Sequence, residues 1–193
     1  GAVASGAPFM VAGAFDQRES DHVFASVSPG RAIAERADVL AFETEPLLGP
    51  LEIAGGFEAH LWVSSDAPDT DIAITLIDVH PPSHDYPQGY AMNLAHGVLR
   101  LRFRDGFEEP RLMTPGETYR IHIQGFPTAN RFMPGHRVRL HVASSNFPHF
   151  DVNPNTGAPA GEDSRPRRAR NTLRFGVDRP SHIVLNVVGQ VRR

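Results

Sequence analysis

The sequence predicts an all-β fold, a jelly-roll sandwich of antiparallel strands with only a few short helical turns. Three observations predict it. Gly and Pro number 17 each in 193 residues, which is typical of many strands joined by turns. Short apolar runs with period-2 alternation recur along the chain and are separated by turn residues. Several of these runs have one polar face, as antiparallel strands with one solvated side do.

The length fits one large β domain, spanning residues 1–193. Residues 1–37 are small and polar with little periodicity, so we expect an irregular N-terminal segment followed by a sandwich over 38–193. The first residue is Gly1 rather than methionine. We interpret this start as a cut or processed end.

Seven runs are the expected strands: 39–42, 57–63, 71–78, 98–104, 118–123, 137–142 and 182–188. The clearest alternation places Leu99, Leu101 and Phe103 on one face and arginines on the other. The run that contains His141 places this histidine on a solvated face. About eight strands in two sheets make a jelly roll.

The remaining sequence predicts short helical turns and loops. Short helical turns are expected at 30–38 and 92–96. Long loops are expected at 80–89 and 144–170, where Asn, Pro, Gly and charged residues dominate.

Composition and charge exclude several classes of function. Cysteine is absent, which excludes disulfide scaffolds and thiolate metal sites. The 19 basic residues, all arginine, are scattered among 22 acidic ones with a formal net charge of −3, so we expect no nucleic-acid partner. No apolar run approaches the ~20 residues of a membrane helix, and no signal pattern opens the chain. We therefore expect a soluble protein without a membrane partner, in the cytoplasm rather than exported.

The sequence lacks the motif of a hydrolase nucleophile. A serine on a strained strand–helix turn reads Gly-x-Ser-x-Gly because the turn needs small neighbours, and no serine here has that context. Without a nucleophile the histidines cannot form a triad. We predict no catalytic residue and no cofactor in this chain.

Three carboxylates, Asp66, Asp69 and Asp71, fall within six residues. Such an oxygen-rich loop can hold Ca²⁺. Aspartates at turns also hydrogen-bond the backbone and cap strand ends, and we favour this structural role.

A second group of polar residues, His80, His84 and Asp85, shares one loop. Two prolines interrupt it, and its spacing falls short of a zinc signature. We interpret these residues as surface polar groups and predict no metal site.

Aromatic side chains could line a binding cleft. Trp62 lies within an apolar run, and we favour a core position. The loop residues Phe126, Phe147 and Phe150 could equally line a cleft or an interface.

Several segments together resemble a known family. They are Trp62–Asp71, Asn93–Gly97, Pro127–Arg139, Ser144–Gly157 and Pro180–Leu185. In order and spacing they are similar to the C-terminal domain of the cocaine-esterase and X-Pro dipeptidyl-peptidase family of α/β serine hydrolases, from about residue 38 to the end.

The resemblance implies a jelly roll of the galactose-binding-like type, packed on an α/β-hydrolase catalytic domain that carries the Ser-Asp-His triad. It implies an accessory domain, inactive alone, that braces this partner and could form a homo-oligomer. Residues near Val3, Ala4 and Ser5 would help to wall the acyl pocket.

The loop with Asn146, Asn153 and Asn155 has a physical case for structure, because Asn side chains bond backbone groups and prolines fix the chain. We expect loop bracing rather than substrate contact. The alternative function is a carbohydrate-binding jelly-roll module, which should present two or more aromatic rings on one exposed edge.

Overall fold

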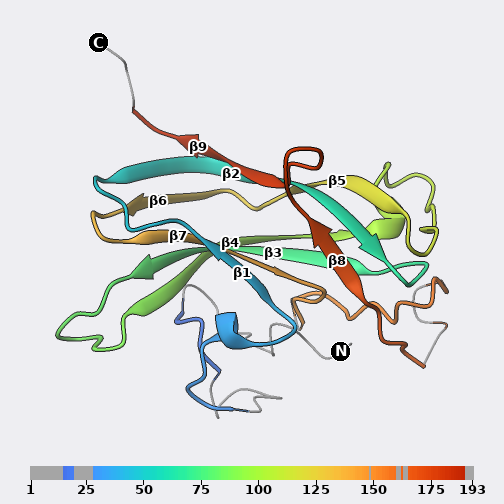
Figure 1. Cartoon of the computed structure of the whole chain (residues 1–193), viewed down its shortest axis with the longest axis horizontal. Helices are drawn as coiled ribbons and strands as arrows, with labels where there is room; N and C mark the ends of the chain where they lie inside the picture. The colour runs from blue at the N-terminus through green and yellow to red at the C-terminus, as the bar shows by residue number, and fades with distance from the viewer. Residues whose placement is uncertain (1–14, 20–27, 148, 160–161, 163–164, 190–193) are drawn as a thin grey trace.

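The computed structural model describes residues 15–19, 28–147, 149–159, 162 and 165–189. In this part of the chain nine strands form two antiparallel sheets stacked face to face (Figure 1). The helical content is two 3₁₀ turns. The predicted all-β sandwich is therefore confirmed.

One sheet has four strands in the order β1-β7-β3-β4. Its members are β1 (Leu40–Glu43), β7 (Arg137–Ala143), β3 (Asp71–His80) and β4 (Tyr90–Arg100). Strand β3 is central and pairs with β4 and β7 along nearly its whole length. Most of its residues are buried, because the other sheet packs on one face of β3 and residues before β1 pack over the other.

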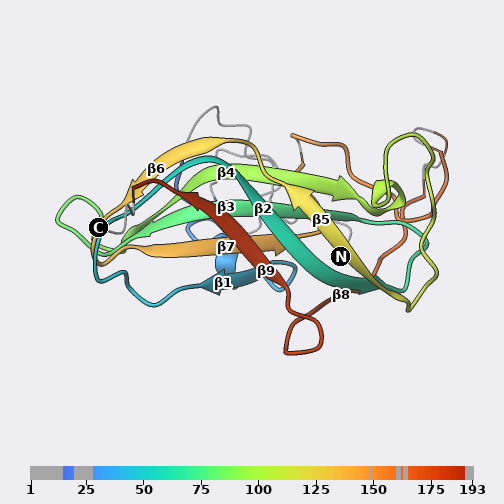
Figure 2. The same ribbon diagram turned by 90° about the horizontal axis from the view of Figure 1, so that it is seen from above.

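The other sheet is built on one long strand, β2 (Leu51–Ser65). One edge of β2 pairs with β5 (Thr118–Gln124) and β6 (Thr128–Phe132), and the other with β9 (His182–Val187) and β8 (Asn171–Arg174). Seen from above in Figure 2, β2 and β9 run over the strands of the four-stranded sheet.

The core lies between the two sheets and takes every second residue of the strands, as period-2 alternation requires. Its largest fully buried apolar side chains are Phe57, Phe132, Leu61, Ile74, Leu76, Leu101, Ile121 and Ile123. Phe57 needs a glycine opposite: a Cβ added at Gly125 would lie 2.0 Å from the phenyl ring. Removal of this apolar surface from water is the main stabilising contribution.

Two expectations about local structure are wrong. Residues 92–96 belong to strand β4 rather than to a helical turn, because β3 pairs with them. The alternating run that follows ends early in a 3₁₀ turn, Leu101–Phe103. Asp69 accepts hydrogen bonds from the backbone N–H and the guanidinium of Arg102, and this turns the chain out of the sheet. The helical turn expected at 30–38 is present as Ile33–Glu35.

A segment before β1 covers the outer face of the four-stranded sheet. The backbone N–H of Gln17 donates to the carbonyl of Ala91 on β4 at 2.8 Å. Ile33 and Val39 are buried against this face. The blue segment beneath the sheets in Figure 1 is this cover.

The cover overturns the expected exposure of His141, which is 4% exposed. The sequence alternation places its side chain on the outer face of the sheet, as predicted. The folded segment then excludes water from that face, and alternation within one strand carries no information about this.

Candidate functional site

The expected structural loop contains a buried network of charged and amide groups. Asp69, Asp71 and Asn153 are at most 4% exposed. The Asn153 amide nitrogen donates to Asp69 at 2.9 Å and to Asp71 at 2.8 Å. Arg102 bonds Asp69, and Arg100 bonds both oxygens of Asp71. Each carboxylate thus has its own guanidinium, and the loop after β7 is tied to the start of β3.

The other predicted loop residues make backbone contacts. Asp66 accepts a hydrogen bond from the N–H of Arg170 at 2.8 Å. The Asn155 amide donates to the carbonyl of Arg167 at 2.9 Å, and its backbone has a positive φ of 62°, which Asn tolerates. The carbonyl of Asn146 accepts from the N–H of His149 at 3.0 Å.

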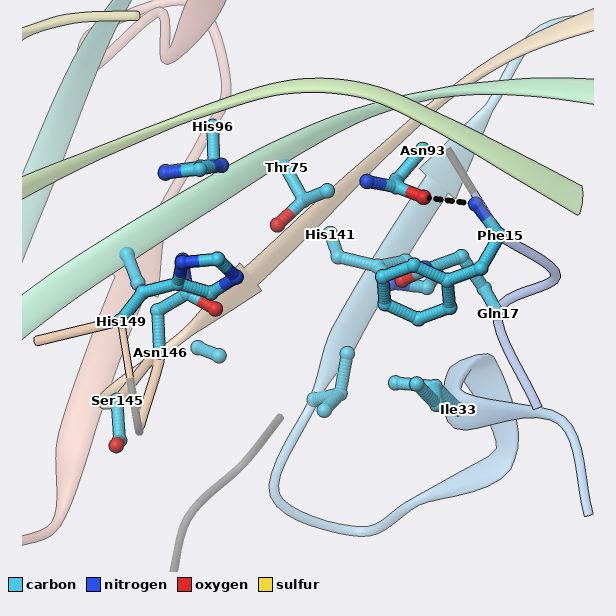
Figure 3. Close-up of a pocket in the computed structure, with 13 residues that line it drawn as sticks. Phe15, Gln17, Ile33, Thr75, Asn93, His96, His141, Ser145, Asn146 and His149 are labelled. Carbon is cyan, nitrogen blue, oxygen red and sulfur yellow. Dashed lines mark hydrogen bonds between the residues drawn. The ribbon is translucent and has the colours of Figure 1, made fainter. Parts of the chain in front are cut away.

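A small pocket lies between the outer face of the four-stranded sheet and its cover (Figure 3). Its volume is about 50 Å³, far below the roughly 300 Å³ at which ligand sites begin. Asn93 accepts a hydrogen bond from the N–H of Phe15 at its rim. The pocket has room for one or two water molecules and is too small for an acyl substrate.

Histidines line this pocket in a water-poor setting. Burial, assisted by the charge of Arg139, lowers the pKa of His141 to about 4. Burial and the nearby His149 also lower the pKa of His96, and the two rings lie 5.0 Å apart. Neutral imidazole is therefore favoured at both positions.

The two residue groups weighed as metal sites do not bring ligands together. His84 and Asp85 contact each other, but their side chains are 102% and 85% exposed. Among the described residues, two other groups bring three ligand atoms within 4.8 Å of one another: Glu58, His60 and His122, and Asp78, His80 and His136. Neither group was expected from the sequence, although an acid-x-His pattern within a strand is a signal for both.

Most of the exposed aromatic residues in the described chain lie apart from one another, although Phe42 and Phe175 meet at one edge. Trp62 lies on the outer face of β2, half-buried, rather than in the core. Rings of Phe126 and Phe150 meet the edge of His96. Among the described residues, four strongly exposed rings lie in four separate loops, at Tyr86, Phe107, Phe126 and Phe175.

An apolar hollow lies where the two sheets part, along β1 and β7 on one side and β8 and β9 on the other. We call it the open-edge groove; its volume is about 420 Å³. Its lining residues are Phe42, Glu43, Thr44, Leu61, Val138, Leu140, Leu173, Phe175, Ser181, His182 and Ile183. Phe42 and Phe175 meet edge to face across it, with ring centroids 5.9 Å apart.

A second hollow of about 270 Å³ adjoins the groove and shares Leu173 with it. The rim is charged: Arg139 bonds Glu43 at 2.8 Å. The sandwich is thus open along one side, where apolar side chains of both sheets reach solvent.

Two further expectations concern the acyl-pocket wall and membrane-spanning segments. Val3, Ala4 and Ser5, expected to wall an acyl pocket, lie outside the described residues. Within the described residues, no helix has the length and apolar character needed to cross a membrane.

Comparison with known proteins places this architecture in a family. Residues 7–184 match the model of the X-Pro dipeptidyl-peptidase C-terminal non-catalytic domain. Cocaine esterase of Rhodococcus sp. is 41% identical over 160 residues, 82% of this chain and 27% of that protein.

Two solved structures are similar as well. An aminopeptidase from a marine sediment Thaumarchaeota archaeon has a TM-score of 0.75 at 32% identity, over 81% of this chain and 27% of its own. An α-amino acid ester hydrolase has a TM-score of 0.74 at 30% identity, over 90% and 32%. The chain spans about a third or less of the length of each of these relatives. The open-edged sandwich described above belongs to the family of X-Pro dipeptidyl-peptidase C-terminal non-catalytic domains.

Proposed function

We propose that this chain is the accessory domain of a serine hydrolase that cleaves acyl esters or X-Pro peptides, and that it braces the catalytic domain of that enzyme. The family match supports the proposal. So do the names of two relatives, a cocaine esterase and an α-amino acid ester hydrolase. The rest of such an enzyme is the partner that the domain would pack against.

The observation that carries the proposal is the open-edge groove. Phe42 and Phe175 are 38% and 68% exposed, and Leu40 beside them is 47% exposed. Contiguous exposed apolar surface with a polar rim is typical of an interface. The charged pair of Glu43 and Arg139 supplies this rim. We propose that an apolar surface of the α/β-hydrolase domain fills the groove.

In this arrangement the chemistry belongs to the partner. Its histidine would deprotonate its serine, the serine would attack the substrate carbonyl, and backbone N–H groups would hold the oxyanion. The accessory domain would keep the catalytic domain folded and exclude water from one side. We propose that the segment near Val3–Ser5 also walls the acyl pocket.

The test uses the whole enzyme and the isolated chain in parallel. Phe42→Glu together with Phe175→Glu should lower the melting temperature and the esterase activity of the whole enzyme, since charges at the centre of an apolar interface typically cost 2 kcal/mol or more. The isolated chain should unfold within about 0.5 kcal/mol of the parent chain, as surface substitutions do. Urea unfolding and p-nitrophenyl acetate turnover measure these effects.

Phe107→Glu is the matched control, because this ring is 78% exposed in a loop outside the groove. It should leave both proteins unchanged. The docking proposal is wrong if the groove variant leaves the whole enzyme as stable as the control does. Turnover of p-nitrophenyl acetate by the isolated chain, sensitive to a serine-directed inhibitor, would contradict the accessory role itself.

A further inference from the structure

The outer face of the five-stranded sheet carries a row of histidines. Glu58 and His60 are two residues apart on β2, so their side chains leave the same face. His122 on β5 lies directly opposite His60 in the antiparallel register. His182 on β9 lies opposite His60 on the other side. Four chemistry-bearing side chains from three strands thus share one patch.

Within this patch two imidazoles converge on one carboxylate. The Nε2 atoms of His60 and His122 lie 3.2 and 3.1 Å from the same Oε2 of Glu58. The two rings are stacked, with centroids 4.7 Å apart and planes 12° from parallel. One ligand atom from each residue lies within 4.8 Å of the other two. To bind one ion, the two rings rotate out of this stack so that both Nε2 lone pairs point to one centre.

We propose that Glu58, His60 and His122 form a binding site for a divalent transition-metal ion, with Zn²⁺ as the representative ligand. Two imidazole nitrogens and one carboxylate oxygen are a donor set that Zn²⁺ accepts. The carboxylate accepts hydrogen bonds from both rings, so each Nε2 carries its proton in the metal-free state. On binding, that proton moves to Nδ1 of the same neutral ring, and Nε2 gives its lone pair to the metal.

The setting favours binding from solution. The side chains of Glu58 and His122 are 46% and 51% exposed, and that of His60 is 22% exposed. The site is therefore open to an incoming ion and leaves coordination positions for water. The sheet fixes the Cα positions of all three ligands, which reduces the conformational entropy that binding costs.

His182 adds a fourth imidazole beside the site. Its ring stacks on His60 at 5.0 Å. Its Nδ1–H donates to the carbonyl of Pro180 at 2.7 Å, which fixes the tautomer that leaves the Nε2 lone pair free. His182 limits the orientation of His60 and presents a further nitrogen to the patch.

The second group, around Asp78, is a weaker candidate for the same chemistry. Asp78 is buried, and its two oxygens already accept hydrogen bonds from Asn130 and His136 at 2.9 Å. A metal ion would have to displace these bonds from a carboxylate that is itself 1% exposed. This group serves as the internal comparison for the test.

The test is zinc titration of the untagged chain by calorimetry. We expect one tight Zn²⁺ per chain and a rise in melting temperature with added metal. His60→Ala together with His122→Ala should weaken this binding by about a hundredfold or more, since loss of an outer-shell partner alone costs about 10- to 100-fold. Glu58→Gln, a milder change, should weaken binding without disturbing the fold, and is the second variant if the double variant does not fold.

Two controls locate the site. His84→Ala, at a fully exposed histidine in a distant loop, should leave binding unchanged. His80→Ala should also leave it unchanged. The proposal is overturned if the chain binds no Zn²⁺, if Glu58→Gln and the double variant bind as the parent does, or if His80→Ala removes binding.

Discussion

The two outer faces of the sandwich differ in what covers them. Residues 15–19 and 28–39 cover part of the four-stranded sheet, and polar side chains beneath them, such as His141, are buried. The outer face of the five-stranded sheet has no such cover among the described residues, and its polar side chains reach solvent. Polar and apolar residues alternate in the same way along the strands of both sheets. We therefore expect the cover to decide how much stability is lost when a charged side chain is removed.

Two carboxylates make the comparison concrete. Glu19 in the cover has a side chain that is 0% exposed and contacts Arg31 at 2.7 Å and Arg36 at 3.0 Å. Glu58 lies on the outer face of the five-stranded sheet, which we call the bare face. It also has two partners, His60 and His122, but is 46% exposed. Burial raises the pKa of Glu19, yet hydrogen bonds from Arg31 and Ser28 and the charge of Arg36 together lower it. Glu19 therefore stays ionised although its carboxylate is buried.

The largest expected effect follows from this pair. Glu19→Gln leaves Arg31 without this carboxylate, while Arg36 keeps its bonds to Asp38, and loss of one partner from a buried pair costs about 3–5 kcal/mol. Glu58→Gln on the bare face should cost less than about 1 kcal/mol, as exposed pairs do. Urea unfolding of both variants without metal measures the contrast. If both variants lose the same free energy of unfolding, the cover does not raise the stability lost when a carboxylate is removed.

The covered face should also make stability sensitive to acid. The folded pKa of His141 is about 4, below the 6.5 of a free imidazole, so the unfolded chain binds the proton first as the pH falls. The contribution of this residue is fully present above pH 6.5 and is lost between pH 6.5 and 4, about 3 kcal/mol in all. His141→Gln should flatten this loss in urea unfolding at pH 7 and pH 4.5.

A neutral substitution on the same face provides the control. Ile77→Val, at a fully buried position, should cost about 1 kcal/mol at both pH values. The interpretation fails if His141→Gln loses as much stability between the two pH values as the parent chain does.

The sequence predicted the sandwich because its strongest signal, period-2 alternation, survives folding. Val138, Leu140 and Val142 lie in the core, as their spacing requires. The alternation also placed His141 on the outer side correctly. Its burial could not be predicted, because the covering residues are about a hundred positions earlier and have no regular pattern of their own.

The sequence also could not predict sites whose residues come from different strands. His60, His122 and His182 are far apart in the chain, and only the register of β2 with β5 and β9 brings them together. The strands β6 and β8 were missed because each is short and is rich in Asn, Arg and Thr, which resemble loop residues. By contrast, the residue types at Asp69 and Asn153 favoured turn and loop hydrogen bonds, and the structure joins these two side chains by one such bond.

The buried network around Asn153 allows the same comparison between a buried and an exposed polar group. Asn153→Ala removes one donor from each of two buried carboxylates, Asp69 and Asp71, and should cost about 2 kcal/mol. Asn186→Ala is the matched control, because that amide makes one exposed hydrogen bond to the carbonyl of Gly56 on the bare side. It should cost less than about 0.5 kcal/mol. If Asn153→Ala and Asn186→Ala lower the free energy of unfolding equally in urea, the Asn153 loop does not depend on its hydrogen-bond network.

The smallest effect is expected at Trp62, the largest side chain on the bare face. Its neighbour Leu61 points the other way and is 2% exposed in the core. Leu61→Ala should cost about 2–5 kcal/mol because it leaves a cavity. Trp62→Ala deletes more atoms but should cost only about 1 kcal/mol, since the side chain is only partly buried on an outer face and water can fill the space. A loss at Trp62 as large as that at Leu61 would mean that the bare face packs against part of the chain beyond the described residues, and that its charges are buried as well.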